Sequence, residues 1–185
     1  MARAIILLLV LISCNTGKLE IINDLPHGLK EVSAVEKTIS SELIWLIEDS
    51  GNESILYATN SRGKLVKSIN INNAENIDWE DLTSDISGNI YIGDFGNNSQ
   101  KRKVFSIYKV IDPMGSNENM QALVINFKLP QGIDQKDFEA FFIHNNHFYI
   151  FNKSRKETKL LKVPNDIGTH TAKIISSYTS VSYTH

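Results

Sequence analysis

The feature that most constrains this chain is a pattern of short strands that occurs three times. Each unit opens with an acidic residue, an apolar residue, a polar residue, a small or acidic residue and a second apolar residue. These openings are Glu31–Val35, Asp78–Leu82 and Asp137–Phe141. A second apolar run follows each opening at nearly constant spacing and has an aromatic residue at its centre, namely Trp45, Tyr91 and Tyr149.

Two further apolar runs complete each unit. The third lies around residues 56–58, 107–109 and 160–162, and the fourth covers residues 65–71, 122–129 and 173–178. No apolar pattern of helical period is long enough to predict a helix. A β-sandwich has no reason to repeat the spacing of acidic and aromatic residues, whereas four strands per unit, repeated about every 50 residues, are typical of β-propeller blades. We therefore expect an all-β fold with about three four-stranded blades over residues 25–180.

Three blades do not close a ring, because known propellers have about 4–8 blades. Either the chain assembles with copies of itself or the sequence is truncated. The terminal segment Val181–His185 matches the translation of GTC TCT TAT ACA CAT, which resembles a transposon adaptor used in sequencing libraries. We therefore expect residues 181–185 to be an adaptor translation and the natural protein to be longer.

The N-terminus has the pattern of a bacterial lipoprotein signal. A positive charge at Arg3 precedes the apolar run Ala4–Ile12, which is far shorter than the ~20 residues that span a bilayer. Leu11–Cys14 then reads as a lipobox that contains the only cysteine of the chain. We expect a signal peptide over residues 1–13, lipid on Cys14, a tether over residues 14–24 and a place in the bacterial cell envelope. The alternative is an ordinary export signal with an incidental cysteine.

Charge and cysteine content exclude several classes of partner and site. The chain has 19 Lys+Arg and 21 Asp+Glu, so it has no basic surface of the kind that binds nucleic acid. One cysteine excludes an intramolecular disulfide and a cysteine-rich zinc site. The expected partners are the membrane, through Cys14, and an unidentified protein or small molecule.

Acidic and amide side chains gather where the predicted strands begin or end. Alternation along a strand places Asp78 and Glu80 on one side, and Trp79 and Asp81 on the other. Such oxygen-rich groups suit Ca²⁺ or Mg²⁺. Ion pairs with Lys153 and Arg102, or a catalytic carboxylate, are the alternatives. The candidate site residues are Asp49, Asp78, Glu80, Asp81, Asp94, Asn97, Asp137 and Glu139.

Glycine and asparagine follow the second strand in the first two units. Their pattern is first of all a turn signal, because glycine supplies a positive φ and asparagine binds the backbone two residues on. The expected turn-forming residues are Gly51, Asn52, Gly96 and Asn98.

Four motifs together resemble exported bacterial lipoprotein propellers related to the six-bladed gluconolactonase, NHL and TolB folds. The motifs are Asp49–Asn52, Asp78–Asp81, Tyr91–Asn98 and Asp137–Ala140, within a resemblance that spans about Leu29–Lys153. It implies a six-bladed ring but brings no agreed activity. Gluconolactonase-like relatives hold a divalent cation in the channel through Glu, Asn and Asp. The residues that the resemblance places in those roles are Glu80, Asp94, Asn97 and Glu139.

Three functions therefore stay open at the level of sequence. The first is an exported, lipid-anchored propeller that binds a partner or small ligand at its channel mouth. The second is a divalent-metal-dependent hydrolase of the lactonase or phosphoesterase type, in which the channel carboxylates are the metal ligands. The third is a purely structural envelope component.

Overall fold

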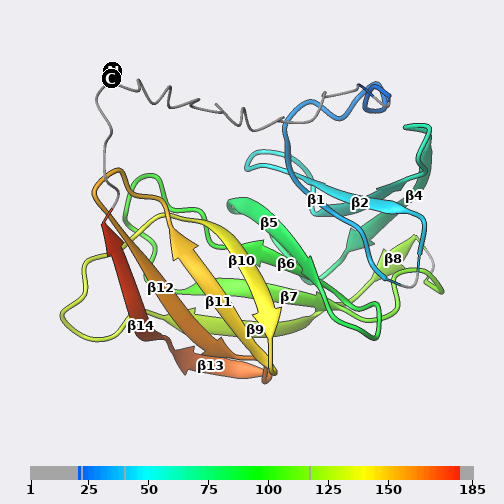
Figure 1. The fold of residues 1–185 in the computed structure, drawn as a ribbon. Helices are drawn as coiled ribbons and strands as arrows, with labels where there is room; N and C mark the ends of the chain where they lie inside the picture. The colour runs from blue at the N-terminus through cyan, green and yellow to red at the C-terminus, as the bar shows by residue number, and fades with distance from the viewer. Residues whose placement is uncertain (1–20, 22, 40, 117, 180–185) are drawn as a thin grey trace, which may run out of the picture.

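The computed structural model describes residues 21, 23–39, 41–116 and 118–179, and these residues form an all-β fold. Within these ranges no helix forms that could span a bilayer. The strands build three sheets that follow one another along the chain (Figure 1). The prediction of an all-β fold is confirmed.

The first sheet has five strands in the order β1-β2-β3-β4-β8. Its first four strands are antiparallel neighbours in chain order, and they coincide with the first unit of the sequence pattern. The fifth strand is short and pairs with β4 in parallel. The strands are β1 (Val32–Glu36), β2 (Ile44–Glu48), β3 (Ile55–Thr59), β4 (Leu65–Ile71) and β8 (Asn119–Met120).

The second sheet repeats this arrangement, with the strand order β5-β6-β7-β9-β13. Its first four strands are again antiparallel neighbours, and β13 pairs with β9 in parallel. The strands are β5 (Trp79–Ser84), β6 (Ile90–Asp94), β7 (Phe105–Val110), β9 (Leu123–Lys128) and β13 (Gly168–Thr171).

The third sheet has four antiparallel strands in the order β10-β11-β12-β14. A two-residue turn joins the first two, in which Asn145 and Asn146 have φ values of 46° and 55° and His144 pairs with His147. Asparagine tolerates this left-handed backbone, which matches the twist of a hairpin. The strands are β10 (Phe138–His144), β11 (His147–Asn152), β12 (Glu157–Pro164) and β14 (Lys173–Thr179).

The short strands β8 and β13 extend sheets that the sequence predicts to have four strands. Each comes from the connection between the third and fourth strands of one unit and pairs with the last strand of the preceding sheet. The ammonium group of Lys67 on β4 also holds the connection that carries β8, since it donates to the carbonyl oxygens of Pro113, Met114 and Ser116. Each such connection ties a sheet to its predecessor.

The core lies in two clusters between successive sheets. Trp45 and Leu56 of the first sheet pack with Trp79 and Ile92 of the second. On the other face of the second sheet, the Tyr91 and Phe148 rings meet edge to face, with their centroids 5.2 Å apart. The second sheet is therefore buried on both faces. This explains why the run at Ile90–Ile92 is apolar without alternation.

Several predictions concern ring closure and the chain ends. The described residues form three sheets and no closed ring. Residues 1–13, Cys14, most of the predicted tether and residues 181–185 lie outside the described residues. At the end of the tether, the side-chain amide of Asn23 donates to the carbonyl oxygen of Arg62 at 2.6 Å, which places this residue against the turn between β3 and β4.

Candidate functional site

In each sheet, the first residue of the first strand lies beside the last residue of the second strand, and we call this end of the strands the edge at which they meet. A backbone hydrogen bond joins these two points in every sheet. Asp49 N donates to Glu31 O at 2.8 Å, Gly96 N to Asp78 O at 3.1 Å, and Lys153 N to Asp137 O at 2.8 Å. The acidic openings of the three sequence units therefore occupy corresponding places at this edge.

Each first strand also carries a β-bulge at the same position of the pattern. The pairing register shifts between Val32 and Ala34 in β1, between Trp79 and Asp81 in β5, and between Phe138 and Ala140 in β10. The unpaired residues are Ser33, Glu80 and Glu139. Because a bulge re-aims the extra side chain, the two glutamates can project toward the edge where the strands begin.

Five carboxylates converge at this edge, and we call them the acidic rim: Asp49, Asp78, Glu80, Asp137 and Glu139. In one group, oxygens of Asp49, Asp78 and Glu80 all lie within 4.8 Å of one another. In the other, the same holds for Glu80, Asp137 and Glu139, so Glu80 belongs to both groups. All five are candidate residues of the sequence pattern, and they come from all three sheets. Oxygens at these separations could share one divalent cation.

Gly96 makes the close approach of two rim carboxylates possible. A Cβ atom at this position would overlap the carboxyl carbon of Asp78 and a carboxylate oxygen of Glu80. Gly96 has no positive φ, so the sequence interpretation of this residue as a left-handed turn glycine is wrong. The site needs glycine here for space.

The other turn predictions agree with the structure. Gly51 has a φ of 84°, and the side-chain amide of Asn52 donates to the carbonyl oxygen of Asp49 at 3.1 Å. Asn98 lies in an exposed turn. These residues close the loops around the rim without adding a carboxylate to it.

Burial and like charge together raise the pKa of Glu80 to about 8. Loss of hydration is the largest cause, followed by the negative charges of Glu139, Asp78, Asp49 and Asp137. Burial also raises the pKa of Asp78, which the charges of Asp49 and Asp137 reinforce and a hydrogen bond from Ser50 opposes. Glu80 therefore keeps its proton at neutral pH, so that not all rim carboxyls are charged at once.

Lys153 supplies positive charge to one side of the rim. Its ammonium group lies 2.6 Å from a carboxylate oxygen of Glu139 and 4.0 Å from one of Asp137. The hydrogen bond to Glu139 raises the pKa of Lys153. The lysine side chain is 59% exposed, so it could move away if another cation entered.

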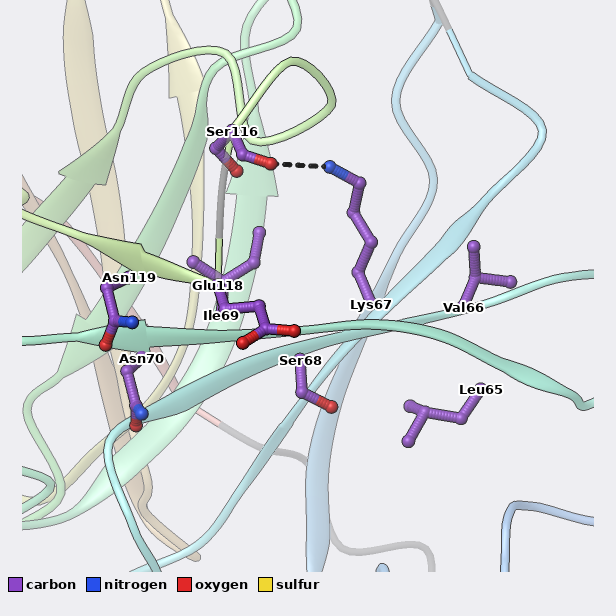
Figure 2. Close-up of a pocket in the computed structure, with 9 residues that line it drawn as sticks. All are labelled: Leu65, Val66, Lys67, Ser68, Ile69, Asn70, Ser116, Glu118 and Asn119. Carbon is purple, nitrogen blue, oxygen red and sulfur yellow. Dashed lines mark hydrogen bonds between the residues drawn. The ribbon is translucent and has the colours of Figure 1, made fainter.

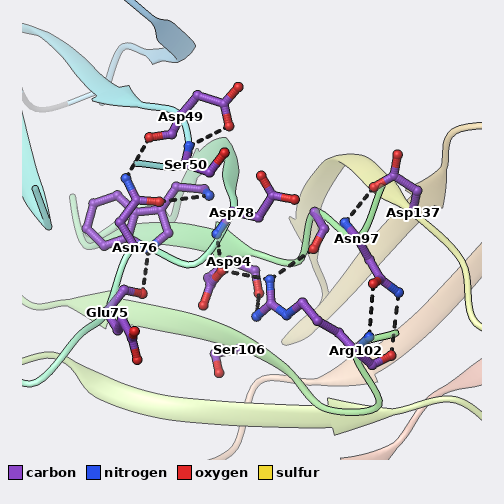
Figure 3. A network of polar contacts seen from close by, with 12 residues as sticks. Asp49, Ser50, Glu75, Asn76, Asp78, Asp94, Asn97, Arg102, Ser106 and Asp137 are labelled. Carbon is purple, nitrogen blue, oxygen red and sulfur yellow. Dashed lines mark hydrogen bonds and ion pairs between the residues drawn. The ribbon is translucent and has the colours of Figure 1, made fainter. Parts of the chain in front are cut away.

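Asp94 lies beneath the rim and is held by Arg102 (Figure 3). Its Oδ1 atom accepts from Asp78 N and from Nη1 of Arg102, both at 2.9 Å. Arg102 also donates to the carbonyl oxygens of Gly96 and Asp94. Burial raises the pKa of Asp94, while the guanidinium opposes that rise. The alternative of an internal ion pair with Arg102 is therefore realised, and this carboxylate supports the rim from below.

Asn97 positions a rim residue through its backbone. Its N–H donates to Oδ1 of Asp137 at 2.6 Å, while its side-chain oxygen accepts from the backbone N–H groups of Lys101 and Arg102. Its side-chain amide donates to the carbonyl oxygen of Lys136 at 3.0 Å. The side chain is thus engaged in holding the 97–102 loop, which differs from the ligand role that the family resemblance implies.

Asp81 lies away from the rim. Its carboxylate accepts from the backbone N–H groups of Phe141 at 2.8 Å and Leu82 at 2.9 Å, and burial raises its pKa to about 6. Trp79 packs toward the first sheet, whereas Asp81 reaches β10 of the third. The prediction that both share one side of the strand is wrong, because the bulge at Glu80 interrupts the alternation.

A groove of about 960 Å³ lies elsewhere, along β4 and the segment that carries β8 (Figure 2). Its titratable residues are Lys67, which is held by backbone carbonyl groups, and Glu118. This pair lacks the convergence of carboxyl groups seen at the rim. The rim is therefore the stronger candidate site.

Comparison with known proteins leaves the family open. No family model matches the chain, and no curated protein is significantly similar to it. Among solved structures, the computationally designed Ika4 protein has a TM-score of 0.42 at 9% identity, over 81% of this chain and 78% of the other. A complex of KlAtg21 with the coiled coil of AgAtg16 has a TM-score of 0.39 at 9% identity, over 80% and 57%. Both likenesses are too distant to show a shared fold.

Proposed function

We propose that the three sheets are blades of a β-propeller whose acidic rim binds a divalent cation, with Ca²⁺ preferred, at the mouth of the channel. The observation that carries this proposal is the convergence of five carboxylates in two groups of three that share Glu80, with the oxygens of each group within 4.8 Å of one another. Ca²⁺ takes about 6–8 oxygen ligands in flexible geometry, which suits carboxylates on adjacent loops and bulges. The bound ion would then present open positions to a ligand with oxygen donors.

Calcium titration of the full chain at pH 8 tests this function, with Cys14→Ser introduced to prevent lipidation. We expect binding heat and a higher melting temperature with Ca²⁺ than with chelator. Glu80→Gln and Glu139→Gln should each weaken binding at least tenfold, whereas Glu42→Gln should leave it unchanged, since Glu42 pairs with Lys37 outside the rim. No heat and no response to chelator would refute the proposal.

We further propose that the protein is exported and held at the bacterial cell envelope through lipid on Cys14. The support is the sequence pattern of Leu11–Cys14 after a short apolar run. A multiply acylated cysteine gives stable anchoring, because each buried CH₂ contributes about 0.8 kcal/mol. Cys14→Ser should move the protein from the membrane fraction to the soluble fraction, and unchanged retention would contradict the anchor.

A metal-dependent hydrolase of the lactonase or phosphoesterase type is the second candidate, and the grouping of the rim carboxylates favours it. A divalent cation held by these carboxylates could polarise the carbonyl or phosphoryl oxygen of a substrate. Turnover of a lactone or a phosphoester by the Ca²⁺-loaded protein, lost in Glu80→Gln, would support this function. Calcium binding without turnover of either substrate would support the binding module.

A further inference from the structure

Isoleucine side chains project from the connections at the end of the sheets that lies opposite the acidic rim. Because neighbouring strands are antiparallel, the connections from β1 to β2, from β5 to β6 and from β10 to β11 all lie at this end (Figure 1). Ile39 of the first connection is 84% exposed, and Ile86 of the second is 88% exposed. Ile167, which follows β12 at the same end, is 67% exposed. Turns are normally built from Gly, Pro, Asn, Asp and Ser, so three exposed isoleucines there are unusual.

Hydrogen bonds between the sheets join these connections into one surface. The hydroxyl of Ser41 donates to Sδ of Met114 at 3.3 Å, which links the β1–β2 connection to the segment that follows β7. The side-chain amide of Asn165, which follows β12, donates to the hydroxyl of Tyr91 on β6 at 3.1 Å. We call this surface the turn face, and its exposed apolar side chains are Ile39, Ile86, Ile111, Met114 and Ile167.

The N-terminal segment of the chain reaches the sheets at this same end. The last residue of β3 pairs with the first residue of β2, so the turn from β3 to β4 also lies at the turn face. The side-chain amide of Asn23 donates to the carbonyl oxygen of Arg62 in that turn. A Cβ atom added to Gly63 of the same turn would overlap the carbonyl oxygen of Asp24. The path from Cys14 to the sheets therefore arrives at the turn face, at the end opposite the rim.

The length of this path limits how the protein can sit on a membrane. Eight residues, 15–22, separate Cys14 from Asn23. This separation can span at most about 30 Å, at roughly 3.3–3.6 Å per residue. The seven residues of β4 alone extend over about 23 Å. A lipid on Cys14 would therefore hold the turn face near the bilayer, and the rim could reach the bilayer only with the tether almost fully extended past the whole sheet.

We propose that the turn face rests on the lipid bilayer, with Ile39, Ile86 and Ile167 entering the layer between headgroups and acyl chains. Exposed apolar side chains grouped on one surface mark a contact with a protein or a membrane, and the arrival of the lipid-bearing segment at this surface favours the membrane. Apolar side chains buried in this layer add to the hold of a lipid anchor.

This orientation directs the acidic rim away from the bilayer. The rim carboxylates then avoid the anionic headgroups, and the proposed cation site stays accessible to a ligand from solution. The inference rests on the proposed lipid at Cys14 and is independent of cation binding.

Quenching of tryptophan fluorescence by brominated lipid tests this contact. The full chain is coupled through Cys14, its only cysteine, to a maleimide-bearing lipid, so that attachment does not depend on lipidation in the cell. Ile86→Trp reports on the turn face, and Asn98→Trp, in an exposed turn beside the rim, is the matched control. In vesicles of brominated phosphatidylcholine and phosphatidylglycerol, we expect quenching of the added fluorescence to be at least fivefold stronger for Ile86→Trp. Trp45 and Trp79 are fully buried and give a constant background.

Serine substitutions separate the role of the isoleucines from that of the attachment point. Ile39→Ser combined with Ile167→Ser should reduce the quenching of Ile86→Trp at least twofold. Val104→Ser should leave it unchanged, since Val104 is an exposed apolar residue in the β6–β7 loop on the rim side. Quenching that does not respond to the paired serine substitutions would overturn the proposal, because the tether alone would then account for the orientation.

Equal quenching at the two reporter positions would also overturn the proposal. No quenching at Ile86→Trp in these protein-free vesicles would do the same, and would indicate that a protein covers the turn face. Circular dichroism checks that the variants fold, and Ile39→Trp provides a second reporter on this face. The anchor itself is tested by fractionation of Cys14→Ser from cells, so it can fail without affecting the outcome in vesicles, where the coupled lipid supplies the attachment.

Discussion

Glu80 and Glu139 occupy the bulges of two different first strands, and their carboxylate oxygens lie within 4.8 Å of each other. Burial is the main cause that raises the pKa of Glu80 to about 8, and the negative charge of nearby Glu139 adds to the rise. Lys153 donates a hydrogen bond to Glu139 at 2.6 Å and so places a positive charge beside this second carboxyl group. A divalent cation bound between the two carboxyl groups would have to displace the proton of Glu80 in order to take both as ligands.

The stability of the cation-free protein should fall as pH rises between about 5 and 8. Glu80 has a pKa of 4.5 when unperturbed and about 8 in the folded protein, so the folded state binds a proton that the unfolded chain has released. Stability decreases with pH where the folded state binds more protons. We expect a loss of about 1–2 kcal/mol in the free energy of unfolding, because solvent screens a partly exposed carboxylate.

Urea denaturation at pH 5 and pH 8, in the presence of chelator, measures this loss. Glu80→Gln removes the carboxyl group whose pKa is raised to about 8 and should reduce the change with pH, leaving the smaller contribution of Asp81, while Glu42→Gln should retain the full change. An equal loss in the protein with and without Glu80→Gln would contradict the assignment of the pH dependence to this residue.

Removing the ammonium of Lys153 should strengthen calcium binding. The lysine is paired with Glu139 and Asp137, so an entering cation must displace it. Exposed ion pairs contribute about 0.2–1 kcal/mol, and relief of this competition should raise the affinity of Lys153→Met by up to about fivefold. Calorimetric titration at low salt measures the change, with Lys156→Met as a neighbouring control. Weaker binding by Lys153→Met would show that the lysine supports the site.

Loss of Arg102 should destabilise the fold strongly. Arg102→Met would leave the Asp94 carboxylate, which is fully buried, without its guanidinium partner. Removing one member of a buried ion pair typically costs about 3–5 kcal/mol. Lys103→Met, a substitution of the exposed next residue, should change the unfolding free energy by less than about 0.5 kcal/mol. Addition of Asp94→Asn to Arg102→Met should recover part of the loss, because it removes the buried charge.

The sequence predicts the strands and the rim better than it predicts the orientation of individual side chains. The twelve main strands follow apolar alternation or, as at Ile90–Ile92, a continuous apolar run, and both patterns report burial. The bulges at Glu80 and Glu139 do not show in this alternation, because a bulge inserts one residue without changing composition. That is why the predicted side of the strand is wrong for Asp81. The short strands β8 and β13 depend on pairing with a preceding sheet and carry no local apolar pattern.

The roles of Asp94 and Asn97 illustrate the same limit at the site. Both have the residue type of a metal ligand, and both lie next to the rim. Whether their oxygens face the rim depends on the positions of Arg102 and the 97–102 loop. Those positions are set by the folded loop and are not encoded in the local residue pattern. Asp94 and Asn97 therefore support the rim through hydrogen bonds.

We expect Gly96→Ala to weaken calcium binding at the rim while it changes the stability of the fold only slightly. The added methyl group would overlap the ends of the Asp78 and Glu80 side chains, which can move aside at little cost. We expect the unfolding free energy to change by less than about 1 kcal/mol, since Gly96 has no positive φ and alanine lowers the entropy of the unfolded chain. Calcium affinity should fall at least tenfold because the two carboxylates are pushed apart.

Gly132→Ala is the matched control for this substitution. Gly132 has a φ of 80°, and a methyl group added to it would meet no atom within 4 Å, so alanine there strains the backbone without touching the rim. It should cost about 1 kcal/mol in stability and leave calcium affinity unchanged. The two glycine variants are thus expected to affect different properties: Gly96→Ala lowers calcium affinity, and Gly132→Ala lowers stability. Equal calcium affinity in both variants would mean that the spacing of Asp78 and Glu80 does not govern binding.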